Sequence, residues 1–329
     1  MKRFLRFLRL CLYSLVTIVA LGGVLFGYFV YTPDPEIPHL SGTLTTGSVD
    51  VGGLTRTYLA YVPRGLAKDA PLVLMMHGSG ESGARIRFET GYGFDRLADT
   101  HHFVVVYPDA HKGDWNACGT VGDVNANGAG VDDVVFLTGV VHKLVTEIGI
   151  DPDRAFTAGS SRGGFMALRL ALEAPSRFRA VAAVSANVHT PDNFKCKPGP
   201  NGTSSVMIMN GTDDPLVPFG GGEVSFFGFS YRYGNVMSSR DSGQYFADLN
   251  HIAGAPAMNE IQMAEGVHVK HVIWHSSGSN VEVELVAVEG GGHGIPQPYR
   301  RHPRLLGPSP KEPNGPAVIW AFFERQPKG

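Results

Sequence analysis

The fold follows from one stretch of the chain, RAFTAGSSRGGFMALRLAL at residues 154–172. Its first part, Ala155 to Ala158, has the short apolar pattern of a buried strand, and its last part has apolar residues at helical spacing. Between them lies Gly-Ser-Ser-Arg-Gly, which fits the frame G-x-S-x-G with Ser161 at its centre. An abrupt turn from strand to helix strains its middle residue, and side chains at Gly159 and Gly163 would collide with the neighbouring strand or helix. The stretch therefore predicts a strand, a sharp turn and a helix that present the Ser161 hydroxyl at the mouth of a sheet.

The rest of the chain alternates in the same way. Six apolar runs are typical of strands buried on both faces: Leu72–Met76, Phe103–Tyr107, Ala155–Ala158, Ala180–Ser185, Val206–Asn210 and Val281–Val288. Helical patterns follow or separate them, at Asp132–Ile148, Gly164–Leu172 and Pro316–Glu324. Such alternation predicts an α/β fold, with a mostly parallel sheet and helices on both faces.

An antiparallel hairpin is expected at the edge of this sheet. Thr43–Val51 and Leu54–Val62 both have strand patterns, and Gly52-Gly53 between them favours a tight turn. The whole chain of 329 residues, 43% of them hydrophobic, can bury one large core, and its formal net charge of −2 argues against a nucleic-acid partner.

The N-terminus has a different character. An uncharged run from Leu10 to Tyr31 follows four basic residues, Lys2, Arg3, Arg6 and Arg9. As a helix this run would rise about 33 Å, enough to cross a bilayer core of about 30 Å. By the positive-inside rule the basic stub stays in the cytoplasm and the remainder is exported to the periplasm or the cell exterior. The alternative is a long cleavable leader and a secreted protein.

These patterns divide the chain into four parts. We expect a basic stub at residues 1–9, a transmembrane signal anchor at 10–31, a proline-rich linker at 32–40 and one catalytic domain at 41–329.

A serine nucleophile needs a base, and the base needs a third group that orients it. The run Val206–Asn210 ends in Gly-Thr-Asp-Asp-Pro, so that Asp213 and Asp214 compete for the acidic role. We predict Asp214, at the apex of the turn before Pro215, whereas Asp213 would cap the turn. The run Val281–Val288 ends in a glycine-rich loop that carries His293, the predicted base. The order Ser161, Asp214, His293 is that of α/β-hydrolases.

Catalysis of this kind also needs donors for the negative charge that develops on the carbonyl oxygen. A glycine-rich loop, His77-Gly-Ser-Gly, follows the first buried strand. We predict the backbone N–H groups of Ser79 and Arg162 as this oxyanion hole, with Gly80 as a less favoured alternative to Ser79.

Two pairs of residues in the loops are weaker candidates. Trp115 and Asn116 follow the strand at 103–107 and are candidates for lining the substrate cleft, although a tryptophan fits the core equally well. Cys118 and Cys196 lie in the exported part, where they would form a disulfide or remain two free thiols. Neither has the spacing of a metal ligand, and we expect no metal and no cofactor.

Several motifs together resemble the polyhydroxybutyrate depolymerase-type esterase family, to which feruloyl and acetylxylan esterases are related. They are HGSG at 77–80, WNACG at 115–119, VDDVVFL at 131–137, DPDRAFTAGSSRGGFM at 151–166, NGTDDPLVP at 210–218 and GGGHGIP at 290–296. The resemblance runs from about Val49 to the C-terminus. It implies an α/β-hydrolase fold and a cofactor-free serine esterase, with Ser161, Asp214 and His293 in the triad positions.

The chain departs from the family pattern at three places. Arg162 stands where the family usually has Asn, Asn210 where it has His, and Gly294-Ile295-Pro296 where it often has Thr-Trp-Pro. These changes leave the triad intact and bear on the substrate. We therefore predict a membrane-anchored serine ester hydrolase acting on small or oligomeric esters of the hydroxyalkanoate, feruloyl or acetyl type, with polymer degradation less favoured.

Two alternatives remain open at this point. One is a catalytically silent envelope protein that binds a ligand in the same cleft, because a fold alone does not prove chemistry. The other is an amide or peptide hydrolase, because the same triad serves both acyl classes.

Overall fold

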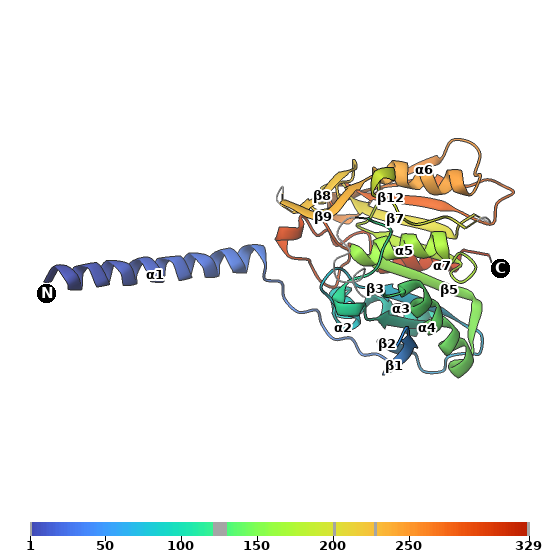
Figure 1. Cartoon of the computed structure of the whole chain (residues 1–329), viewed down its shortest axis with the longest axis horizontal. Helices are drawn as coiled ribbons and strands as arrows, with labels where there is room; N and C mark the ends of the chain where they lie inside the picture. Colours follow the sequence, from blue (N-terminus) through green and yellow to red (C-terminus); the bar gives the residue numbers. More distant parts are fainter. Residues whose placement is uncertain (1, 121–129, 200–201, 227–228, 328–329) are drawn as a thin grey trace.

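The computed structural model describes residues 2–120, 130–199, 202–226 and 229–327. Residue 1 of the predicted stub (1–9) therefore lies outside the described residues. So do residues 328–329 of the predicted catalytic domain (41–329). Figure 1 shows a rounded domain from which one long N-terminal helix projects.

Ten of the described strands form one mixed sheet in the order β1-β2-β4-β3-β5-β6-β7-β12-β11-β10. The strands β4, β3, β5, β6, β7 and β12 run parallel in its centre, and the strands at both edges are antiparallel. Their bounds are β1 Thr43–Val51, β2 Leu54–Val62, β3 Ala70–Met76, β4 Val104–Pro108, β5 Ile150–Ser160, β6 Ala180–Val184, β7 Ser205–Gly211, β10 Ala257–Gln262, β11 His268–Trp274 and β12 Val283–Val288. The expected parallel sheet and the edge hairpin β1–β2 are confirmed.

Helices cover both faces of the sheet, as predicted (Figure 1). One core contains buried residues of α4 (Asp133–Ile148), α5 (Arg162–Glu173) and α6 (Ser239–Leu249). The other contains buried residues of α2 (Gly83–Glu89), α3 (Gly93–His101) and α7 (Gly315–Glu324). Every residue of β3 and of β6 is buried, because the central parallel strands face apolar helices on both sides.

Several elements lie outside the predicted pattern. Helices α2, α3 and α6 and strands β10 and β11 were not predicted, and a small antiparallel pair, β8 (Gly222–Phe226) with β9 (Phe229–Val236), stands apart from the main sheet. All six residues of β10 are exposed. A strand with both faces in water lacks the apolar alternation on which a sequence prediction depends.

Helix α1 spans Lys2–Phe29. It begins within the basic stub and ends two residues before Tyr31. Its apolar side chains are exposed along its whole described length, and no part of its apolar window is buried in the domain. By length and composition, this one helix among the described residues could cross a membrane, and a signal sequence passes the same test.

Candidate active site

The turn between β5 and α5 holds Ser161 in a strained conformation. Its φ and ψ angles are 53° and −118°, a region that side-chain-bearing residues rarely adopt. A Cβ atom on Gly159 would lie 2.2 Å from the Gly163 carbonyl, and one on Gly163 would lie 2.5 Å from the carbonyl oxygen of Met76. Both glycines are therefore required by the close approach of α5 to β5 and β3, which is the geometry that the G-x-S-x-G frame predicts.

The acid turn follows β7 and holds the Asp214 side chain in place. Asp214 Oδ1 accepts hydrogen bonds from the backbone N–H groups of Leu216 (2.8 Å) and Val217 (2.9 Å). Asp214 Oδ2 accepts from His293 Nδ1 at 2.8 Å. Asp214 is buried, whereas Asp213 is exposed and accepts a bond from the adjacent Thr212 hydroxyl. Between the two competing carboxylates, the geometry favours Asp214.

The histidine loop after β12 packs directly on this turn. The N–H of Asp213 donates to the Gly291 carbonyl (2.9 Å), and the N–H of Gly290 donates to the Thr212 hydroxyl (2.8 Å). A Cβ on Gly211 would lie 2.1 Å from the Gly291 oxygen. Parallel neighbours β7 and β12 end at the same edge of the sheet, so these two loops meet although they lie about 80 residues apart in the chain.

Ser161 and His293 line one cavity. Among the described residues no hydrogen bond joins the Ser161 hydroxyl to His293. In ligand-free catalytic sites the contact between nucleophile and base is often long, and it tightens when substrate binds. With Nδ1–H donated to Asp214, the Nε2 atom of His293 is the one left to accept a proton.

The loop after β3 is held by contacts that leave one N–H available. The N–H of Gly78 donates to Glu81 Oε2 (2.9 Å), and the N–H of Gly80 donates to the Gly113 carbonyl (2.8 Å). The N–H of Ser79 forms no hydrogen bond within the described residues. The geometry thus favours Ser79 over Gly80 as the donor. Arg162 begins α5, at the end of a helix where the first N–H groups have no intrahelical acceptors.

The side chain of Arg162 forms a buried ion pair that the sequence analysis missed. Its Nε donates to Asp114 Oδ1 at 3.1 Å, and its guanidinium lies 4.9 Å from the centre of the Tyr233 ring. The Tyr233 hydroxyl is 3.0 Å from the Ser79 hydroxyl. Burial raises the pKa of the Asp114 carboxyl, and Arg162 opposes this rise. A buried arginine without a carboxylate partner is strongly destabilising. The need for such a partner is the sequence signal that could have pointed to Asp114.

The cavity has a volume of about 330 Å³. Its apolar side chains come from five regions of the chain: Ile86 from α2, Phe165 from α5, Leu216 and Val217 from the acid turn, Val224 and Tyr233 from the small sheet, and Ile295 and Leu306 from the C-terminal loops. This small sheet belongs to the segment 219–237, whose residues 227–228 lie outside the described part of the chain.

Two acidic residues, Glu81 and Glu89, also line the cavity. Burial and the neighbouring Glu89 carboxyl raise the pKa of Glu81 from its ordinary 4.5 to about 8. The Glu89 carboxyl is near enough to hydrogen-bond to Glu81, and such a bond between two carboxyl groups requires a proton on one of them. An acidic residue in a glycine-rich strand-end loop was the available sequence signal for this pair.

The prediction that Trp115 and Asn116 line the substrate cleft is wrong. Trp115 is completely buried and its Nε1–H donates to the His77 carbonyl at 2.9 Å. Asn116 receives a bond from Lys195 Nζ (2.9 Å), and its own N–H donates to Asp133 Oδ2 (2.7 Å). Neither residue contributes to the cavity wall. Trp115 packs beneath the loop after β3 and holds it from the core side instead.

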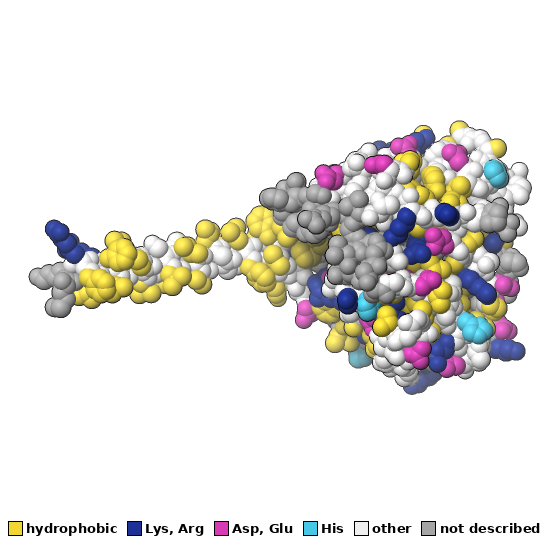
Figure 2. Space-filling view, in the orientation of Figure 1, with side chains coloured by type: hydrophobic (Ala, Val, Ile, Leu, Met, Phe, Trp, Pro, Cys, Tyr) yellow, Lys and Arg dark blue, Asp and Glu magenta, His cyan; other side chains and the backbone are white. Residues whose placement is uncertain are grey.

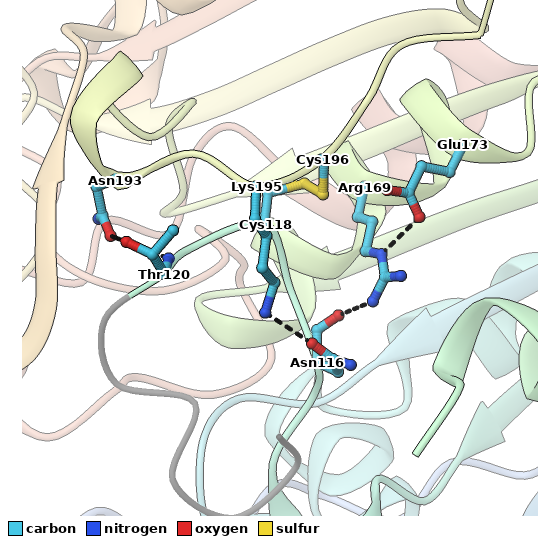
Figure 3. Close-up of a disulfide and its surroundings, with 8 residues drawn as sticks. All are labelled: Asn116, Cys118, Thr120, Arg169, Glu173, Asn193, Lys195 and Cys196. Carbon is cyan, nitrogen blue, oxygen red and sulfur yellow. Dashed lines mark hydrogen bonds and ion pairs between the residues drawn. A yellow bond between two sulfur atoms is a disulfide. The ribbon is translucent and has the colours of Figure 1, made fainter. Parts of the chain in front are cut away.

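Cys118 and Cys196 are joined by a disulfide bond, which links the loop after β4 to the loop after β6. Figure 3 shows the bond beside an ion pair, Arg169 with Glu173, and beside the Lys195–Asn116 contact. Burial and nearby arginines lower the pKa of Lys195 to about 8. Thr120, two positions after Cys118, donates its hydroxyl to Asn193 Oδ1.

One cluster of side chains with metal-ligating atoms lies away from the cavity. Among the described residues, one group has ligand atoms within 4.8 Å of one another: Glu260, His268 and Glu289. Glu260 belongs to β10, His268 to β11, and Glu289 directly follows β12. None of them lines the cavity, and exposed acidic groups of this kind are common without a metal.

The sheet order, the strained serine turn and the acid–histidine contact define the α/β-hydrolase class. Residues 56–195 match the family described as Esterase PHB depolymerase, and residues 131–264 match the one described as Phospholipase/Carboxylesterase. Each match covers less than half of the chain, and together they confirm the resemblance drawn from the motifs. Both matched models have an esterase or carboxylesterase in their descriptions.

Two relatives illustrate the similarity. The protein named "Putative esterase NocK" from Nocardia uniformis subsp. tsuyamanensis is 33% identical over 194 residues, which are 58% of this chain and 54% of that protein. "Poly(3-hydroxyalkanoate) depolymerase C" from Paucimonas lemoignei is 25% identical over 252 residues, 72% of this chain and 58% of that protein. The chain thus spans little more than half the length of these two relatives.

A solved structure supports the fold. The "Acetyl xylan esterase from Aspergillus awamori" superimposes with a TM-score of 0.55 at 18% identity, covering 76% of this chain and 94% of that one.

Proposed function

We propose that this protein is a serine esterase in which Ser161, His293 and Asp214 form the catalytic triad. The observation that carries the proposal is the 2.8 Å contact of His293 Nδ1 with Asp214 Oδ2 at a cavity that Ser161 also lines. The two residues come from neighbouring strand ends, and the strained turn of Ser161 opens toward the same space.

The reaction would proceed in two halves. The Ser161 hydroxyl oxygen attacks the ester carbonyl while His293 Nε2 takes its proton, and the resulting imidazolium gives that proton to the departing alcohol. Water, deprotonated by the same histidine, then attacks the acyl-enzyme and releases the carboxylic acid and free Ser161. Asp214 keeps the proton of neutral His293 on Nδ1 and stabilises the imidazolium that forms.

The N–H groups of Ser79 and Arg162 would bind the oxyanion. Ser79 is held by the neighbouring loop contacts, and Arg162 stands at the positive end of α5. Donors fixed before the reaction cost no reorganisation when charge develops, and each is worth about 3–4 kcal/mol in such sites.

The proposed substrates are small or oligomeric esters. The apolar cavity of about 330 Å³ is at the lower end of the range for small-molecule sites. Relatives are named for hydroxyalkanoate, feruloyl and acetylxylan esters. The acyl group would occupy the apolar wall.

We further propose that α1 is a signal anchor that holds residues 41–329 outside the cytoplasm, with residues 32–40 as a linker. The Cys118–Cys196 disulfide supports this placement, because such bonds persist in oxidising compartments and are rare in the cytosol.

The experiment uses the full chain purified in detergent, with short p-nitrophenyl esters and a fluorophosphonate probe. Wild type should hydrolyse the esters and be labelled once per chain, and Ser161→Ala should lose both properties, with kcat reduced by at least about 10³-fold. Ser160→Ala is the matched control and should keep most of the activity. Hydrolysis by Ser161→Ala at the wild-type rate would refute the assignment.

A further inference from the structure

One loop near the C-terminus borders both the cavity and the end of helix α1. We call residues 299–306 the arginine loop, since they read YRRHPRLL. His302 and Leu306 of this loop line the cavity. The Leu306 carbonyl also accepts the N–H of His293 at 2.6 Å, so the loop supports the catalytic histidine directly.

The opposite side of the arginine loop contacts the C-terminal end of α1. Arg300 Nη2 donates to the Thr32 hydroxyl (2.6 Å), and Arg301 Nη2 donates to the Tyr31 carbonyl (2.9 Å). The guanidinium of Arg304 lies 4.3 Å from the centre of the Tyr28 ring. These three contacts fix the direction in which α1 leaves the domain.

The elements that line the cavity lie on the side of the domain that faces α1. Figure 1 shows α2, the pair β8–β9 and the red C-terminal segment at that side, next to the root of the helix. All of them contribute to the cavity wall, through Ile86, Val224, Tyr233 and Leu306. Figure 2 shows hydrophobic side chains gathered where α1 meets the domain.

The chemistry of this junction suits a lipid–water interface. Tyrosines at the end of a membrane helix sit at headgroup depth, and that place is held by Tyr28 in the last turn of α1 and by Tyr31, two residues after its end. The arginine loop adds three guanidinium groups and itself contains no acidic residue, while Asp34 and Glu89 lie near the buried Arg300. Arg300 is buried, against the Phe88 ring, whereas Arg304 is exposed. Exposed arginines beside a bilayer bind anionic phospholipid headgroups.

We propose that the arginine loop and the end of α1 form one surface that binds anionic phospholipid headgroups and holds the mouth of the catalytic cavity against the membrane, so that esters dissolved in the bilayer are favoured substrates. This inference rests on the proposed esterase function and on the proposed anchor. It goes beyond both, because an anchor followed by a linker could equally leave the cavity facing bulk water.

The first test compares two substrates with the full chain in lipid nanodiscs containing phosphatidylglycerol and phosphatidylcholine. 4-Methylumbelliferyl oleate dissolves in the bilayer, and 4-methylumbelliferyl acetate stays in water. Arg304→Glu should lower the rate on the oleate about tenfold, because two units of charge change near an anionic surface. The rate on the acetate should stay within about twofold of wild type, which also shows that the variant is folded.

Arg240→Glu is the matched control. It makes the same charge change at an exposed position of α6, which lies away from α1 in Figure 1. It should leave both rates unchanged. In nanodiscs of phosphatidylcholine alone, the effect of Arg304→Glu should shrink, which separates headgroup charge from any other role of Arg304. Equal rates for both variants and wild type on the oleate would overturn the inference.

The second test is independent of activity. In a Cys11→Ala background, a spin label is placed at Pro298→Cys, an exposed position beside the arginine loop, or at Arg240→Cys on α6. In nanodiscs the label at 298 should be shielded from a water-soluble relaxation agent and reached by oxygen, while the label at 240 stays accessible to water. Equal water accessibility at both positions would refute the membrane contact.

The outcomes separate the two proposals. Hydrolysis of neither ester by wild type, with a shielded label at 298, contradicts the esterase and keeps the membrane surface. Hydrolysis of the acetate with no use of the bilayer-dissolved oleate keeps the esterase and contradicts the orientation of the cavity.

Discussion

His293 Nδ1 and Asp214 Oδ2 lie 2.8 Å apart, although 79 positions separate the two residues in the chain. The contact is possible because β7 and β12 are parallel neighbours whose carboxyl ends meet at one edge of the sheet. Two further N–H groups, from Leu216 and Val217, hold the other oxygen of the Asp214 carboxylate. The carboxylate is thus fixed by three donors, and its orientation does not depend on a bound substrate.

The first prediction distinguishes the two adjacent aspartates. Asp214→Asn should lower kcat for p-nitrophenyl esters by about 10⁴-fold, because an amide in this position no longer imposes the right tautomer on His293. Asp213→Asn should keep kcat within about twofold, because Asp213 is exposed and, among the described residues, its side chain hydrogen-bonds only to Thr212. A larger loss for Asp213→Asn than for Asp214→Asn would reverse the assignment.

The second prediction concerns the buried Arg162–Asp114 pair. Arg162→Met should lower the free energy of unfolding by about 3–5 kcal/mol, because it leaves the Asp114 carboxylate buried without its cation. The double variant Arg162→Met/Asp114→Asn should lose less than the sum of the two single changes. Urea unfolding of Arg162→Met, Asp114→Asn and the double variant measures the three free energies of unfolding. Strict additivity would show that the pair contributes no coupling.

The third prediction uses the raised pKa of Glu81. A carboxyl with a pKa of about 8 in the folded chain and 4.5 when unfolded binds a proton more tightly in the fold. Its contribution to stability is therefore fully present below pH 4.5 and is lost as the pH rises through 8. Glu81→Gln cannot ionise, so its melting temperature minus that of wild type should rise by roughly 2–4 °C between pH 6 and 8.5.

Glu147→Gln is the control for this pH dependence. Glu147 is exposed and pairs with Lys143 on the surface of α4, where an ion pair contributes little. The melting temperature of Glu147→Gln minus that of wild type should stay constant between pH 6 and 8.5. A flat profile for Glu81→Gln as well would contradict the shared proton.

The fourth prediction concerns the disulfide. Replacing both Cys118 and Cys196 by serine should lower the free energy of unfolding by about 2–4 kcal/mol, because the bond closes a loop of 78 residues and restricts the unfolded chain. A reducing agent should destabilise wild type similarly and leave the double variant unaffected. Cys11→Ser, on α1, should behave as wild type. Insensitivity of the wild type to reductant would show that the two thiols are free in solution.

Much of the fold was predictable because the buried elements carry strong local patterns. The central strands are apolar throughout and α4 and α5 have regular periods, so their existence was correctly predicted and their ends were off by a few residues. The exposed strand β10 and the short helix α2 carry no comparable pattern. Trp115 shows the limit for a single side chain, because its sequence fits either a cleft or a core and only packing against His77 decides between them.

By itself, the sequence determined the serine turn. Gly159 and Gly163 permit a backbone approach that any side chain would block, and this steric requirement is local. Tertiary structure decided which aspartate meets His293, that Arg162 is paired with Asp114, and that the arginine loop joins the cavity to the end of α1. Each of these contacts joins residues far apart in the chain, and their distance depends on strand order and loop packing, which no local pattern of residues encodes.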